Sequence, residues 1–224
     1  MRTSFIIITI ICLTVIYGCT SGRISNSQTE ENNQLKGKIR GEAYLFDVKL
    51  KRDGKPTSFR LEIYNTDSIT AFSGRGYLGK GALKGIIDDD SILVYFPTSN
   101  EFLNESTTTL LDLKDCINEL EFLNLFELMT NLPTDIKIDS NLSINSSFEN
   151  TSEPQFELYN PSCSWNLNLS YDKRKTGWRL KSFSIDDGIS NNIKATRRTY
   201  KHNAKIPYKR FNVNIPDNAY RIIP

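Results

Sequence analysis

The sequence is poor in the residues that most enzymes use for chemistry. It has one histidine, His202, and four cysteines among its 224 residues. His202 lies in a basic stretch without a neighbouring cluster of cysteines or carboxylates, which favours a surface residue over a base or a ligand. No spacing of histidines and cysteines is typical of a zinc site, and a serine nucleophile would lack an identifiable base. We therefore expect a protein that is not an enzyme and that carries no metal or other cofactor.

The sequence also lacks a phosphate-binding glycine loop and a large excess of one charge. The glycines between residues 74 and 81 are followed neither by a Lys-Ser or Lys-Thr pair nor by a predicted helix. The acidic run 88–90 could bind calcium, but a solvated turn is the simpler interpretation. Lysine and arginine total 28 against 26 acidic residues, and this balance argues against nucleic acid as a partner.

The C-terminal third is locally basic. A solvated strand face is the favoured interpretation, and contact with anionic lipid headgroups is the alternative. The cations concerned are Lys194, Arg197, Arg198, Lys201, Lys205, Lys209 and Arg210.

The longest uncharged apolar run lies at the start of the chain, over residues 5–17, with Arg2 as the only charge before it. It is shorter than the roughly 20 residues that a membrane-spanning helix needs, and its arrangement is typical of a signal peptide. The run ends at Ile16-Tyr17-Gly18-Cys19, which resembles the lipobox of bacterial lipoproteins, although Tyr17 stands where a smaller residue is usual. The alternatives are an ordinary signal peptide and an uncleaved anchor helix.

The lipobox resemblance implies that residues 1–18 are a signal peptide and that Cys19 carries a diacylglycerol with acyl chains such as palmitate. Two or three acyl chains anchor a protein stably, whereas one holds it only marginally. Residues 19–34 are polar and are expected to form a flexible tether. Cys116 and Cys163 then remain as a pair in an oxidising compartment, as a disulfide or as two buried thiols.

Alternation of apolar and polar residues predicts a mainly β domain over residues 35–224. A change of phase near Ser182 predicts a bulge. The expected strands lie at 44–50, 59–64, 69–71, 82–87, 91–96, 136–138, 156–158, 165–171, 178–185, 193–201 and 208–215. Residues 109–132 show apolar spacings of three and four and predict a helical stretch, which Asn131 and Pro133 end. We expect a strongly curved antiparallel sheet, or an incomplete β-barrel of about 10–11 strands, with a helical lid inserted mid-chain.

The order of these elements resembles the LolA/LolB-like proteins of lipoprotein localisation in the bacterial envelope. The similar stretches are Phe59-Arg-Leu-Glu-Ile-Tyr, Gly76-Tyr-Leu-Gly-Lys-Gly, the run from Ser91 to Phe102, and the closing run from Phe211 to Ile222. In that family the concave apolar face of the sheet holds acyl chains beneath helices, and the receptor branch carries an exposed apolar residue on an early loop. Tyr77 and Leu78 occupy a comparable place, with an ordinary hairpin turn as the alternative.

The resemblance implies a membrane-anchored envelope lipoprotein that binds lipid or lipoprotein acyl chains, with lipoprotein localisation as one role. The alternative is an assembly lipoprotein with a solid core that binds another envelope protein. Thr20, rather than Asp, follows Cys19, which favours the outer membrane, facing the periplasm, in a Gram-negative host. The expected cavity residues, for which an ordinary filled core is the alternative, are Phe46, Val48, Phe59, Leu61, Ile63, Trp165, Leu167, Leu169, Leu120, Leu123 and Phe126.

Overall fold

The computed structural model describes residues 37–52, 54–76, 79–108, 122–137, 142–147, 153–160, 164–186, 188 and 191–222. Several predictions fall outside these ranges and stay predictions. They concern the signal peptide, Cys19, the tether, Tyr77, Leu78, Leu120, Cys116 and Cys163.

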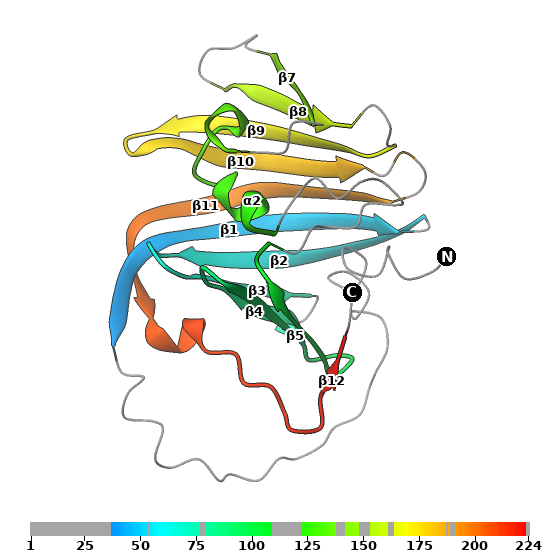
Figure 1. Ribbon diagram of the computed structural model, residues 1–224, viewed down its shortest axis with the longest axis vertical. Helices are drawn as coiled ribbons and strands as arrows, with labels where there is room; N and C mark the ends of the chain where they lie inside the picture. The colour runs from blue at the N-terminus through cyan, green and yellow to red at the C-terminus, as the bar shows by residue number, and fades with distance from the viewer. Residues whose placement is uncertain are drawn as a thin grey trace.

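One curved sheet of twelve strands makes up the domain, and it does not close into a barrel (Figure 1). Its spatial order is β12-β6-β5-β4-β3-β2-β1-β11-β10-β9-β8-β7. All neighbours pair antiparallel except β12 and β6, which are parallel. The predicted fold class is therefore confirmed. The strands are β1 (Lys38–Arg52), β2 (Lys55–Asn65), β3 (Thr70–Arg75), β4 (Gly81–Ile87), β5 (Ser91–Phe96), β6 (Glu101–Ser106), β7 (Ser143–Ser147), β8 (Gln155–Tyr159), β9 (Asn166–Arg174), β10 (Gly177–Asp186), β11 (Asn192–Pro207) and β12 (Tyr220–Arg221).

The long central strands β1 and β11 give the sheet much of its curvature. They pair from Lys38 opposite Pro207 to Lys51 opposite Asn192, and the register shifts twice along the way. Such irregularities bend strands and increase their twist, and Figure 1 shows both strands turning sharply downward at one end of the sheet. The predicted bulge near Ser182 is confirmed by a register shift between Leu180 and Ser182 in the β9–β10 pair.

The sheet buries one face along most of its length. In β1 the side chains of Phe46, Val48 and Leu50 are buried, whereas those of Asp47 and Lys49 between them are exposed. This period of two places alternate residues on the concave, apolar face. The face carries the main core, which extends from β6 to β8 and includes Leu103, Phe156 and Leu158.

A short helix lies over the concave face. Helix α2 (Phe122–Glu127) crosses the middle of the sheet in Figure 1, and turns continue the chain to Thr130. The described part of the predicted helical stretch 109–132 is thus helical only in α2. No helix within the described ranges has the length and hydrophobicity of a membrane span.

Two predicted strands are wrong. Residues 133–135 form the 3₁₀ turn η3 (Pro133–Asp135), and Ile136 and Lys137 after it are outside any strand. Pro133 favours this turn because its fixed φ suits the first position of a helix. Residues 208–215 are not a strand either, because η4 (Tyr208–Phe211) and an irregular segment take their place. Strand β1 begins at Lys38, opposite Pro207, so within the described residues the ladder between β1 and β11 ends where η4 begins.

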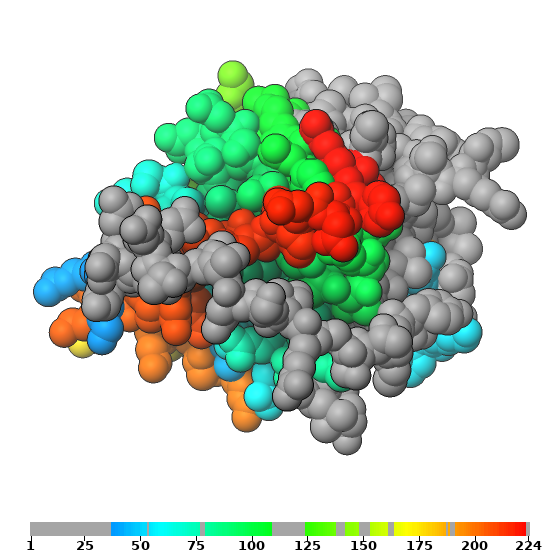
Figure 2. Space-filling view, turned by 90° about the horizontal axis from the view of Figure 1, so that it is seen from below, coloured from blue at the N-terminus to red at the C-terminus, as the bar shows by residue number. Residues whose placement is uncertain are grey.

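The segment after η4 returns to the far edge of the sheet and forms β12, as Figure 2 shows in orange and red. The Tyr220 N–H donates to the Asn100 carbonyl at 3.0 Å, and the Ile222 N–H donates to the Phe102 carbonyl at 2.7 Å. This pairing covers the outer edge of β6, which would otherwise leave its backbone groups unpaired.

A glycine in β4 makes room for a core aromatic ring. A Cβ atom on Gly85 would overlap the Phe72 ring and lie 2.8 Å from the Leu93 carbonyl oxygen.

We predict that Gly85→Ala lowers the free energy of unfolding by about 1–3 kcal/mol, because the ring must leave its packed position. Urea denaturation followed by circular dichroism measures this change. Gly37→Ala is the matched control, since no atom lies within 4 Å of the position that its Cβ would take. Equal stability of the two variants would contradict the close packing of Phe72 on Gly85.

Candidate functional site

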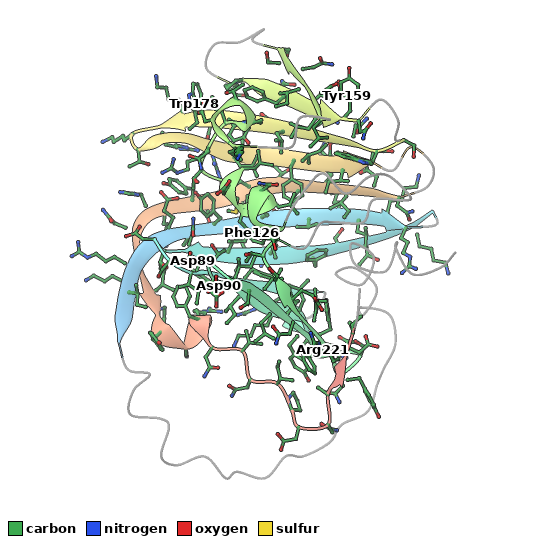
Figure 3. The ribbon with its side chains drawn as sticks, in the orientation of Figure 1. Asp89, Asp90, Phe126, Tyr159, Trp178 and Arg221 are labelled. Atoms are coloured by element: carbon green, nitrogen blue, oxygen red, sulfur yellow. The ribbon has the colours of Figure 1, made fainter. Side chains whose placement is uncertain are left out.

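An apolar cavity of about 170 Å³ lies between the concave face and α2. Every residue that lines it has a hydrocarbon or thioether side chain. Figure 3 shows Phe126 of α2 over the middle of the sheet, and its ring lies 5.6 Å from that of Phe72 on β3. The lining residues are Phe46, Val48, Phe59, Leu61, Ile63, Phe72, Leu83, Ile92, Val94, Leu125, Phe126, Leu128, Met129, Leu167, Leu169, Leu180, Phe183, Ile185 and Ile193.

Strand register brings these side chains together from distant parts of the sequence. Phe46 on β1 lies opposite Leu61 on β2, and Leu169 on β9 lies opposite Phe183 on β10. Because each residue is at an inward position of its strand, its side chain projects toward the cavity.

Hydrogen bonds fix the chain directly after α2 to the sheet. The Tyr171 hydroxyl donates to the Leu128 carbonyl at 2.9 Å, and the Leu180 N–H donates to the Met129 carbonyl at 3.0 Å. Tyr171 is fully buried, and burial raises the pKa of its hydroxyl, which therefore stays a protonated donor. Leu128 and Met129 are consequently held against the strands as the edge of the cavity.

Most of the predicted cavity residues lie at this one cavity: Phe46, Val48, Phe59, Leu61, Ile63, Leu167, Leu169 and Phe126. Trp165 is buried in the main core but does not line the cavity. Leu120 and the side chain of Leu123 lie outside the described part of the chain. That any of these residues binds a ligand stays a prediction.

Other lining residues were not predicted. Leu83, Leu180 and Ile193 lie within strands that the alternation predicted, so the pattern already indicated them as inward candidates. Phe72 follows directly after the predicted strand 69–71. Leu128 and Met129 lie in the turn after α2. The apolar spacing of a helix does not predict where the side chains of a turn point. The residues that sequence reasoning missed are Phe72, Leu83, Ile92, Val94, Leu125, Leu128, Met129, Leu180, Phe183, Ile185 and Ile193.

A polar network ties the bend of β1 and β11 to β10. One Glu42 carboxylate oxygen accepts from the Arg179 guanidinium at 2.7 Å and from the Tyr200 hydroxyl at 2.8 Å. The other oxygen accepts from the Tyr44 hydroxyl at 2.6 Å. The side chains of Arg179 and Glu42 are only 10% and 14% exposed, whereas His202, whose Nδ1 lies 3.4 Å from Glu42, is exposed.

Two opposing effects determine the pKa of Glu42. Burial raises this pKa, whereas hydrogen bonds from Arg179, Tyr44 and Tyr200 lower it. The effect of the hydrogen bonds is the larger of the two, so the net shift of the pKa is downward. The network therefore holds a carboxylate and a guanidinium as a charged pair, and its partners come from strands far apart in the sequence. Within the described ranges, no group of three or more histidines, cysteines, aspartates and glutamates could hold a metal ion.

Comparison with known proteins found similar solved structures, but no similar sequence or sequence family. No protein-family model and no curated protein matches the chain. An uncharacterized conserved protein from Thermus thermophilus is similar with a TM-score of 0.42 and 9% identity, over 80% of this chain and 89% of that chain. A DUF1329 family protein from Desulfovibrio piger is similar with a TM-score of 0.43 and 9% identity, over 80% of this chain and 92% of that chain. Similarity at this level identifies neither a family nor a function, and the LolA/LolB-like assignment stays a prediction.

We predict that Glu42→Gln lowers the free energy of unfolding by about 2 kcal/mol at neutral pH, because Arg179 loses its buried counter-charge. A carboxylate with a lowered folded pKa stabilises the protein above its unfolded pKa and loses that effect as the pH falls through the folded value. The difference from the wild type should therefore shrink as the pH falls below the ordinary pKa of 4.5. Denaturant titrations over a pH series measure it.

The control for this prediction is Glu153→Gln. Glu153 pairs with Lys181 at the same distance of 2.7 Å, but the two side chains are 42% and 40% exposed. An exposed pair contributes less than about 1 kcal/mol. A cost for Glu42→Gln no greater than that of Glu153→Gln would mean that the buried network adds no stability.

Proposed function

We propose that this protein is a lipid-anchored envelope protein that binds acyl chains of lipids or lipoproteins in the cavity beneath α2, without catalysing a reaction. The observation that carries the proposal is the wholly apolar lining of a cavity of about 170 Å³. A lining of this kind offers no hydrogen bonds to water or to a polar ligand, and it favours a hydrocarbon.

The energetic cost of an empty cavity supports this proposal. At roughly 24 cal/mol per Å³, a void of this size costs about 4 kcal/mol, a large share of the roughly 5–15 kcal/mol that stabilises a typical domain. Each methylene that enters recovers about 0.8 kcal/mol, so about five would offset the cost. An apolar cavity of about 150 Å³ admits benzene, so this one suits the end of an acyl chain.

The predicted anchor at Cys19 would hold the acyl-chain-binding domain at a membrane. A domain fixed to a membrane by two or three acyl chains stays beside the lipids or lipoproteins whose chains it would take up. This is the arrangement that the LolA/LolB-like resemblance implies, and it favours a receptor or carrier in lipoprotein localisation at the outer membrane. The alternative, an assembly lipoprotein with a solid core, does not account for the cavity.

We predict that Leu61→Trp weakens binding of a fluorescent fatty acid at least tenfold, because the indole occupies the space of the ligand. The same change should raise the free energy of unfolding by about 1 kcal/mol, since filling a void stabilises a fold. Fluorescence titration and urea denaturation measure the two effects, whose opposite signs distinguish a ligand cavity from a damaged core.

Leu45→Trp is the matched control for this substitution. Leu45 lies on β1 at a position opposite Glu62, on the other face of the same sheet, and its substitution should leave fatty-acid binding unchanged. Unaltered binding by the Leu61→Trp protein would argue against the cavity as the binding site. Absence of fatty-acid binding by the wild type would refute the proposed function.

For the anchor, we predict that Cys19→Ala abolishes incorporation of labelled palmitate in a bacterial host, because the sulfur that receives the diacylglycerol is gone. Cys12→Ala should leave labelling unchanged, since residue 12 lies within the predicted signal peptide. Mass spectrometry of the mature N-terminus checks the cleavage site. Labelling that survives Cys19→Ala would show that the lipobox assignment is wrong.

A further inference from the structure

A second cavity lies on the other face of the sheet. Its volume is about 400 Å³, and β2, β3, β4 and η4 surround it. We call it the basic cleft, and its lining residues are Tyr64, Phe72, Ser73, Gly74, Arg75, Gly81, Leu83, Lys84, Pro97, Lys209 and Arg210. Figure 2 shows the orange and red C-terminal segment, which contains η4, on the outside of the molecule beside the green strands.

Paired residues of three neighbouring strands form the floor of the basic cleft. Glu62 on β2 lies opposite Ser73 on β3, and Ser73 lies opposite Lys84 on β4. These three residues alternate with inward residues such as Phe72 and Leu83, so their side chains emerge on the convex face. A row of polar groups therefore crosses three strands beneath η4.

Among the described residues, four cations line the basic cleft, against the single carboxylate of Glu62 on its floor. Arg75 and Arg210 share the neighbouring Glu62, with nitrogen–oxygen distances of 3.7 and 3.2 Å. The Arg210 guanidinium also lies 5.2 Å from the centre of the Tyr64 ring, which orients it over the sheet. One carboxylate thus positions two arginines without neutralising the cleft.

Two further groups in the basic cleft have no partner in the described part of the chain. The Ser73 hydroxyl oxygen is buried and makes no hydrogen bond. Lys84 is half-buried, and burial together with the charge of Arg210 lowers the pKa of its ammonium group. A partly buried ammonium beside a guanidinium is unfavourable unless an anion joins them.

We propose that the basic cleft binds a phosphate group, with Lys84, Arg210 and the Ser73 hydroxyl as its donors. Guanidinium and ammonium groups form short, charge-assisted hydrogen bonds with phosphate oxygens. Such a ligand would supply the acceptor that Ser73 lacks and the counter-charge that Lys84 lacks. The binding is independent of the apolar cavity, which lies on the opposite face of the same strands.

The phosphate could belong to a lipid headgroup or to a soluble molecule. The position of η4 favours the headgroup, because the Tyr208 N–H donates to the Gly37 carbonyl at 3.0 Å. The basic cleft therefore lies close to the point at which the chain enters the domain from the predicted anchor at Cys19. A membrane surface rich in anionic lipid attracts cations at such a point.

Calorimetric titration of the full chain in a neutral detergent tests the proposal. One arm adds inorganic phosphate, a second adds mixed micelles with phosphatidylglycerol, and a third adds mixed micelles with phosphatidylcholine. We expect phosphate to bind at millimolar concentration and to compete with phosphatidylglycerol. If phosphate binds but phosphatidylglycerol does not, the natural ligand of the basic cleft is a soluble phosphate compound. If only phosphatidylglycerol binds, and its binding depends on Lys84, the natural ligand is a lipid headgroup.

Three variants locate the binding. Lys84→Met should weaken it about tenfold or more, and Lys49→Met, on an exposed part of β1, is the matched control that should not change it. Ser73→Ala should weaken binding about threefold without lowering the unfolding midpoint, because the hydroxyl has no partner to lose. The proposal is overturned if no arm shows binding, or if Lys84→Met binds as Lys49→Met does. Neither outcome bears on fatty-acid binding in the cavity.

Discussion

The hydrogen bonds from β9 and β10 to the chain after α2 determine how the concave face is covered. Tyr171 and Leu180 hold the carbonyls of Leu128 and Met129, and this places the turn against one half of the sheet. Phe126 then reaches the other half, where it meets Phe72 on β3. Within the described residues, α2 and the turn after it cover only part of the width of the curved sheet, and an apolar cavity lies between their side chains and the strands.

The curvature itself depends on the bend of β1 and β11, where the ladder loses its regular register. At that bend the Glu42 carboxylate joins Arg179 of β10 to Tyr200 of β11. A buried ion pair contributes little net stability compared with apolar packing, but it allows few alternative geometries. We infer that the network maintains the angle between the two halves of the sheet, and through it the width of the cavity.

The sequence predicted the inward face of the sheet better than its edges. Alternation from Trp165 to Tyr171 is regular, and its inward residues are buried as expected. Strands β6 and β7 escaped prediction because most of their residues are polar, and β12 because it has only two residues. The segment 208–215 alternates like a strand, yet a strand also needs a neighbour, which local pattern does not reveal. The same limit applies to Glu42 and Arg179, which are 137 positions apart.

The two candidate sites share strands but not a face. Phe72 and Leu83 line both the apolar cavity and the basic cleft, whereas Ser73 and Lys84 project only to the convex side. Strands β3 and β4 pair from Thr70 opposite Ile87 to Arg75 opposite Gly81, with one register shift between Gly74 and Arg75. Because the backbones of these paired strands lie between the two sites, we infer that an acyl chain in the cavity belongs to a different molecule from a lipid whose phosphate occupies the cleft. The arrangement therefore favours two separate roles: the convex face would orient the domain on anionic headgroups, and the concave face would remain free to take a chain from another molecule.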